Sequence, residues 1–93
     1  MIAMKKSEAL EQPESNRVGV FSTHDLALAA FLVTSSHKLL KLDRANPKKV
    51  SFLFERTESI DHDVEHYWAN QIKVNPRAYF DDLRMLKNRI YSD

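Results

Sequence analysis

The sequence predicts a small α+β domain with the element order β-α-β-β-α-α, in which a three-stranded antiparallel or mixed sheet packs against helices. Three observations predict this fold. Residues 20–32 change from a strand pattern to a helix that is apolar on nearly every face. Two further strand-like segments flank an Asn-Pro turn signal at Asn46-Pro47. Two amphipathic helical patterns then complete the chain.

The composition fits one globular domain without a membrane segment. The chain has 93 residues, of which 43% are hydrophobic and 29% charged. It has no cysteine, which excludes disulfides, thiolate zinc sites and thiol nucleophiles. The longest apolar run, residues 26–33, is too short to span a bilayer. We therefore expect a cytoplasmic protein that does not contact membranes.

The N-terminal part of the chain differs from the rest. Residues 1–16 mix charges, Ser, Gln and Pro13 without a sustained period, so we expect a flexible tail there and one domain over residues 17–93. Residues 17–21 are short and β-branched, which favours the first strand. Gly19, the only glycine, suits a strand with a close backbone neighbour.

The first helix is expected from about residue 24 to residue 35. Ser22 or Thr23 can accept hydrogen bonds from its first amides, and Asp25 adds favourable negative charge near its positive end. Three alanines permit close approach to a sheet. This helix is predicted to be the buried centre of the domain.

A β-hairpin is predicted next, with arms at residues 39–43 and 50–55. In the second arm, apolar residues alternate with mixed ones: Val50, Phe52 and Phe54 against Ser51, Leu53 and Glu55. One face of this strand is therefore expected to pack on the first helix.

Two amphipathic helices follow, the first capped by Thr57 and the second begun by Asn75-Pro76. The expected apolar stripes are Ile60, Val64, Tyr67, Trp68 and Ile72 in the first, and Phe80, Leu83, Leu86 and Ile90 in the second. We expect a core that includes Phe31, Phe52, Phe54, Trp68 and Leu83.

Several short motifs indicate a resemblance to a known family. They are Phe21-Ser22-Thr23-x-Asp25-Leu26-x-Leu28-Ala29-Ala30, His37-x-Leu39-Leu40, residues 50–55, Tyr67-Trp68 and Val74-Asn75-Pro76-Arg77. Over residues 18–91 the chain resembles a family of short bacterial and phage-associated proteins known only as a domain of unknown function. The resemblance implies a self-contained fold and a bacterial or phage origin. Relatives tend to carry glycine at the position of Ser36. The family resemblance implies no activity, ligand or catalytic residue.

The sharpest catalytic motif is His62-Asp63-Val64-Glu65-His66, which matches the H-x-x-E-H pattern of inverted zinc peptidases. At about 100° per residue, however, both histidines fall roughly opposite the apolar stripe of their helix. They are predicted to face solvent, so we expect no metal site.

The other histidines also favour structural roles. His24 and Asp25 stand at a helix start, and His37 stands where it can hydrogen-bond free carbonyls at the helix end. With one glycine in the chain, no phosphate-cradling loop is possible. We therefore expect a protein that works by binding, without a cofactor or catalytic activity.

The charge distribution points to one kind of partner. Residues 38–50 have five cations and one acid, a net charge of +4: Lys38, Lys41, Arg44, Lys48 and Lys49 against Asp43. Residues 55–66 have a net charge of −4. A basic hairpin can follow a phosphate backbone. The exposed side of the last helix can extend this surface through Arg77, Arg84, Asn88 and Tyr91. The structural alternative is that its lysines protect a sheet edge and keep the domain soluble.

The leading functional hypothesis is thus a nucleic-acid-associated accessory or regulatory protein. The second is a protein-interaction module, such as a homodimer that modulates a host or phage partner. Leu53, on the outer strand face, and Tyr79, one residue off the helical stripe, are its expected contact residues. Only phosphate binding should weaken steeply with salt.

Overall fold

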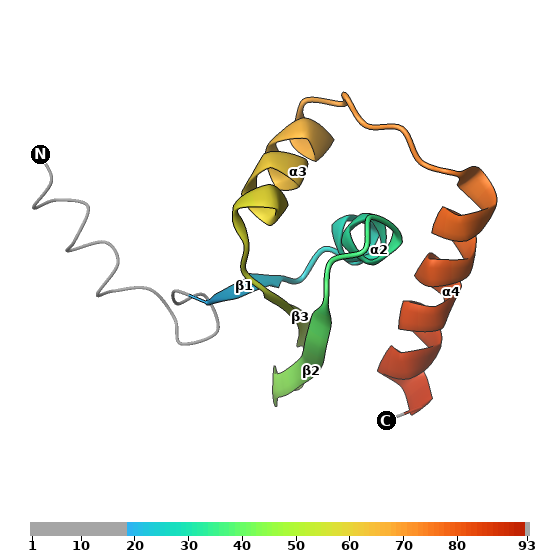
Figure 1. The fold of residues 1–93 in the computed structure, drawn as a ribbon. Coiled ribbons are helices and arrows are strands. Elements are labelled where there is room, and N and C mark those ends of the chain that lie inside the picture. Colours follow the sequence, from blue (N-terminus) through green and yellow to red (C-terminus); the bar gives the residue numbers. More distant parts are fainter. Residues whose placement is uncertain (1–18, 93) are drawn as a thin grey trace, which may run out of the picture.

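The computed structural model describes residues 19–92 and has the predicted element order. The elements in Figure 1 are β1 (Val20–Thr23), α2 (Leu26–Thr34), β2 (Leu39–Asn46), β3 (Lys49–Glu55), α3 (Glu58–Trp68) and α4 (Pro76–Ser92). The tail predicted over residues 1–16 lies outside the described residues. The fold is α+β, as the sequence predicts.

The three strands form one sheet in the order β1-β3-β2, and both strand pairs are antiparallel. The hairpin is longer than expected, because β2 continues to Asn46 and β3 begins at Lys49. The Asn46 side-chain oxygen accepts a hydrogen bond from the Lys48 amide at 2.9 Å, which closes the turn locally. The basic turn residues therefore project as a tip, which we define as residues 46–49.

The start of α2 differs from the prediction. Of the strand expected over residues 17–21, residues 17 and 18 lie outside the described residues; β1 lies over Val20–Thr23 and continues past the expected end, so that Thr23 pairs with Phe52 of β3. Because the strand extends through Thr23, the N-cap of α2 is Asp25, whose carboxylate accepts from the Leu28 amide at 3.1 Å. The Thr23 hydroxyl accepts instead from the Asp25 amide at 3.0 Å. The expected cap at Ser22 or Thr23 is wrong.

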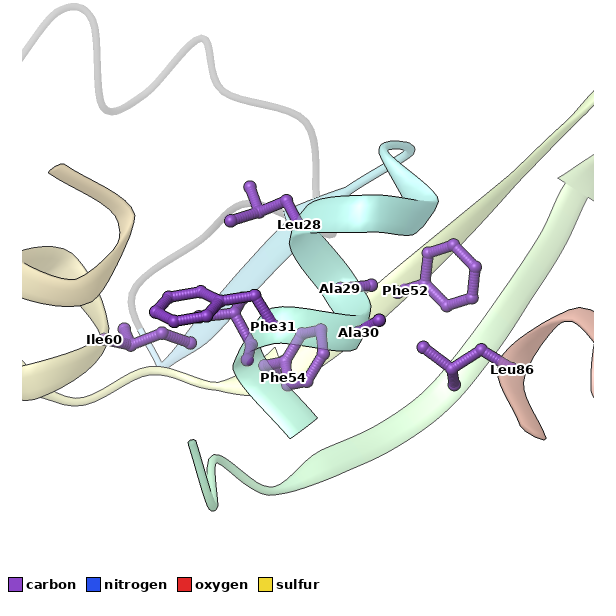
Figure 2. Packing of buried hydrophobic residues seen from close by; sticks show 9 residues of the cluster. Leu28, Ala29, Ala30, Phe31, Phe52, Phe54, Ile60 and Leu86 are labelled. Atoms are coloured by element: carbon purple, nitrogen blue, oxygen red, sulfur yellow. The ribbon is translucent and has the colours of Figure 1, made fainter. Parts of the chain in front are cut away.

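Helix α2 is the buried centre of the domain, as predicted. Figure 1 shows α3 and α4 on opposite sides of it, with the sheet against a third side. In Figure 2, Ile60 of α3 and Leu86 of α4 reach α2 from these two sides. The fully enclosed cluster comprises Leu28, Ala29, Ala30, Phe31, Leu32, Phe52, Phe54, Ile60 and Leu86.

Two aromatic residues expected in the core are exposed instead. Trp68 is 63% exposed and Phe80 is 53% exposed. In α3, Tyr67 takes the inward position and its ring centroid lies 5.6 Å from that of Phe31. In α4, Tyr79 replaces Phe80 in the stripe that packs on the core, together with Leu83, Leu86 and Ile90. The expected burial of Trp68 and Phe80 is therefore wrong, whereas Tyr67, which was also expected in the apolar stripe, does pack against the core.

Both α2 and α3 end in a left-handed residue. After α2, Ser36 has φ 72°, and the His37 amide donates to the Leu32 carbonyl at 2.9 Å. After α3, Asn70 has φ 61°, and the Gln71 amide donates to the His66 carbonyl at 2.9 Å. These bonds define a Schellman motif, in which glycine is the usual left-handed residue.

Candidate nucleic-acid interface

The lysines of the hairpin are exposed. Lys48 and Lys49 lie at the hairpin tip, Lys41 lies on β2 opposite Leu53, and Lys38 precedes β2. Within residues 19–92, none of these four lysines forms an ion pair. Their ammonium groups are therefore available to an anionic partner.

Arg44 has a structural contact instead. Its guanidinium donates to the carbonyls of Arg89, at 2.7 Å, and Ile90, at 3.1 Å. These carbonyls belong to the last turn of α4, where a helix leaves its acceptors unsatisfied and carries partial negative charge. Arg44, predicted as a phosphate contact, thus fastens the hairpin to the end of α4.

A cavity of about 400 Å³ lies where the hairpin tip, the start of α2 and the end of α4 meet. Lys48 and Lys49 line it together with His24 and Ile90. His24 is held by β3, because its Nδ1 lies 3.1 Å from the Ser51 hydroxyl. The tip lysines therefore stand beside α4, although about forty residues separate the two segments in sequence.

Helix α4 carries cations and aromatic rings on one exposed face. This outer face of α4 comprises Arg77, Phe80, Arg84, Lys87 and Tyr91. The five positions are spaced three and four residues apart, which places them along one side of a helix. The Arg84 guanidinium lies 5.4 Å from the centre of the Phe80 ring, within cation–π distance.

The acidic groups of α4 lie away from this face or at its edge. Asp82 is turned toward α2, where its carboxylate accepts from the Thr34 hydroxyl at 2.8 Å. Asp81 is exposed beside the outer face. Within residues 19–92, none of Arg77, Arg84 and Lys87 forms an ion pair.

Most other acids lie on α3, across α2 from α4 (Figure 1). Helix α3 contains Glu58, Asp61, Asp63 and Glu65. Asp61 accepts from the Arg56 guanidinium at 3.1 Å, and both side chains of this pair are partly exposed. The domain is thus acidic on the α3 side and basic along the hairpin tip and α4.

The two residues expected to contact a protein partner are less exposed than predicted. Leu53 is only 7% exposed, because β3 is the middle strand and Ser22 and Lys41 flank it on the two sides. Tyr79 packs against the core, and its hydroxyl donates to the Ala27 carbonyl at 3.2 Å. The expected exposure of both residues is wrong.

Two tyrosines near the start of α2 have altered acidity. Burial raises the pKa of Tyr79 above its ordinary value, and the nearby charge of Asp25 raises it further. The pKa of Tyr67 is raised by burial, then by Asp25 and Tyr79. Both phenols therefore favour the neutral form, in which the Tyr79 hydroxyl can donate to the Ala27 carbonyl.

The histidine motif of α3 has the predicted orientation. His62 and His66 are both exposed. No cluster of three or more His, Cys, Asp or Glu residues suited to hold a metal occurs within residues 19–92. His37, expected to bond helix carbonyls, instead directs its ring toward Asp63 of α3.

Sequence reasoning missed part of the α4 surface. The sequence predicts an extension of the basic hairpin by Arg77, Arg84, Asn88 and Tyr91, but it does not indicate Lys87, and its apolar stripe wrongly includes Phe80. The three-and-four spacing from residue 77 to residue 91 is readable in the sequence and was the signal for a second, exposed stripe.

A comparison of the chain with models of known families finds a match. A family model described as "Domain of unknown function (DUF5659)" covers residues 19–92. The chain belongs to this family. The DUF5659 match spans every element from β1 to α4, so the family unit and the described fold coincide. The resemblance to a family known only as a domain of unknown function is thereby confirmed, whereas the bacterial or phage origin stays a prediction.

Other comparisons add no relative. The search of curated proteins and the search of solved structures each found no match to this DUF5659 chain. Within residues 19–92, every helix is too short or too polar to cross a bilayer.

Proposed function

We propose that this DUF5659 domain binds nucleic acid through the hairpin tip and the outer face of α4. The observation that carries the proposal is the pair of hydrogen bonds from Arg44 to the last turn of α4. They hold Lys48 and Lys49 beside a helix that presents further cations. Two basic segments thus adjoin, while the acidic α3 lies across α2 (Figure 1).

Charge segregation supports this function better than the total charge does. The net charge of +1 supplies little long-range attraction to a polyanion. Five exposed cations nevertheless lie on the basic side: Lys48, Lys49, Arg77, Arg84 and Lys87. Each phosphate that such a side chain neutralises releases a counterion, so the affinity depends on salt.

The test is fluorescence anisotropy with single-stranded and double-stranded oligonucleotides of mixed sequence, titrated from low salt upward. In Lys48→Glu combined with Lys49→Glu, we expect binding to weaken about tenfold or more and the salt slope to become shallower by about 1.4 to 1.8. The thermal midpoint of the double variant should stay near that of the parent protein, because both side chains are exposed.

The matched control places the same change of charge on the other side of the domain, in Arg56→Glu combined with Lys73→Glu. We expect a much smaller loss of affinity from it, because these residues flank the acidic α3. Absence of binding by the intact protein at low salt contradicts the proposal. An equal loss in both double variants contradicts the assigned surface.

The second candidate function is recognition of a protein partner, and Trp68 favours it. Its indole is 63% exposed and stands edge-on to Tyr67, with ring centroids 5.0 Å apart. Tryptophan is enriched among residues that dominate protein interfaces. A mass increase with concentration in sedimentation or light scattering, insensitive to salt and abolished by Trp68→Ala, would support this function for self-association.

A further inference from the structure

We infer that the ligand of the proposed surface is a single-stranded nucleic acid, whose bases stack on Phe80 and Tyr91 while its phosphates contact the neighbouring cations of α4. This inference rests on the proposed function and names its ligand class. It adds a stacking role for two aromatic residues that the charge argument does not use.

The first step is the exposure of the two rings. Phe80 is 53% exposed and Tyr91 is 79% exposed, so each presents much of its aromatic surface to water. Aromatic rings are normally buried, since removal of their surface from water is favourable. The core of this domain is filled from α4 by the stripe that contains Tyr79 and Leu86. Packing of the core therefore does not explain the two outer rings.

The second step is their arrangement with the cations. Phe80 and Tyr91 lie eleven positions apart on the outer face of α4, which corresponds to roughly 16 Å along a helix. Arg84 and Lys87 stand between them in sequence, and Arg77 stands one turn before Phe80. Rings and cations thus lie interspersed along one line. A single strand presents bases and phosphates to such a surface together, and stacking accepts any base because each has a π-face.

The third step concerns the contact within the free protein. The Arg84 guanidinium lies 5.4 Å from the Phe80 ring centre. A planar guanidinium over an aromatic ring is itself a platform on which a base can stack, and its charge remains available to the adjacent phosphate. Arg84 therefore holds ring and charge together at one point of the surface.

Duplex DNA and a second copy of this chain fit the face less well. In a duplex, the bases are stacked on one another, so Phe80 and Tyr91 have no free base face to contact. If α4 packed symmetrically against α4 of another copy, Arg84 and Lys87 of one copy would approach Arg84 and Lys87 of the other. These like charges repel one another. Apart from Asp81 at the edge of this face, the exposed acidic groups that such a partner needs lie mainly on α3.

The experiment compares three probes of equal length at one salt concentration: a mixed-sequence single strand, the corresponding duplex, and a single strand of abasic nucleotides. The abasic strand has the phosphates without the bases. We expect the normal single strand to bind at least tenfold more tightly than the abasic strand, and more tightly than the duplex.

The variant arm removes each ring while the charge is kept. Phe80→Leu and Tyr91→Leu should each weaken binding to the normal single strand by about five- to a hundredfold. Neither should change the affinity for the abasic strand. The matched control is Trp68→Leu, which removes an exposed ring from α3 on the other side of α2 and should leave all three affinities unchanged.

The outcomes separate the inference from the proposed function. If the duplex or the abasic strand binds as tightly as the normal strand, or if both leucine variants retain the parental affinity, the stacking inference is overturned. Salt-dependent binding that is lost in the Lys48 and Lys49 variant still supports the proposed function in that case. If none of the three probes binds at low salt, both are overturned.

Discussion

The ring of His37 and the carboxylate of Asp63 are joined by a hydrogen bond of 2.6 Å, in which the His37 Nε2 donates to Asp63. The bond connects the turn after α2 to the middle of α3. The His37 side chain is only 8% exposed, whereas that of Asp63 is 36% exposed. The backbone amide of His37 donates to the Leu32 carbonyl at the end of α2. The imidazole is therefore not needed to bond that carbonyl, and it makes the contact between the two elements instead.

We predict that Asp63→Ala lowers the free energy of unfolding by about 1–3 kcal/mol, because it leaves a buried imidazole without its partner. The matched control is Asp61→Ala, on the same helix. Its loss should stay below about 1 kcal/mol, since Asp61 and Arg56 form an exposed pair. Urea unfolding at neutral pH measures both. Equal losses would show that the buried bond adds no more than the exposed one.

The core and the outer face of α4 respond differently to loss of a phenyl ring. Phe52→Ala should lower the free energy of unfolding by about 3–5 kcal/mol, because Phe52 is fully buried between the sheet and α2. Phe80→Ala removes the same ring from an exposed site and should cost no more than about 1 kcal/mol. Denaturant unfolding of the two variants provides the comparison. A loss below about 1 kcal/mol for Phe52→Ala would remove that residue from the core.

Ser36 is a site where a single substitution should stabilise the fold. Its φ of 72° is strained for a residue with a Cβ atom, and glycine adopts it freely. We expect Ser36→Gly to raise the free energy of unfolding by about 0.5–1 kcal/mol, after the greater freedom of glycine in the unfolded chain is included. Ser35→Gly is the control, because Ser35 has φ −88° and should gain nothing from glycine. A higher thermal midpoint for Ser35→Gly than for Ser36→Gly would contradict the backbone strain assigned to Ser36.

The pH dependence of stability should change at alkaline pH. The folded protein raises the pKa of Tyr79 and Tyr67 above 10.0, so it binds their protons more tightly than the unfolded chain does. The resulting stabilisation is complete below that pH and is lost as the pH rises through the folded pKa values. Unfolding midpoints in urea should therefore fall above about pH 10.

Tyr79→Phe tests the assignment of that alkaline loss. It should reduce the fall in stability above about pH 10. At neutral pH it should cost about 1 kcal/mol, because the hydrogen bond to the Ala27 carbonyl is lost. An unchanged alkaline profile in this variant would place the titrating group elsewhere.

Local patterns in the sequence were sufficient for the type and order of the elements. An all-round apolar helix has only one stable place, the centre of the domain, and α2 occupies it. The alternation around Phe52 and Phe54 likewise assigned the inward face of β3. The phase of His62 and His66 follows from α3 alone, so their exposure was also predictable.

Adjacent aromatic residues could not be assigned in the same way. Tyr67 and Trp68, and likewise Tyr79 and Phe80, lie about 100° apart on their helices, and hydrophobicity favours the wrong member of each pair. The rotation of each helix about its own axis, as it packs on the core, selects the inward residue. That rotation depends on packing between elements distant in sequence, and in α4 it places Tyr79 against the core and Phe80 on the candidate surface.

The basic surface likewise has features that the sequence determined and features that only the tertiary structure decided. The sequence by itself determined that cations gather in the hairpin and along α4, because charge is a property of each residue. Only the tertiary structure decided that Arg44 bonds the end of α4 while Lys48 and Lys49 remain exposed beside it. The free carbonyls of a helix end exist only once that helix has formed and docked against the hairpin, so no local pattern records which cation they will bind.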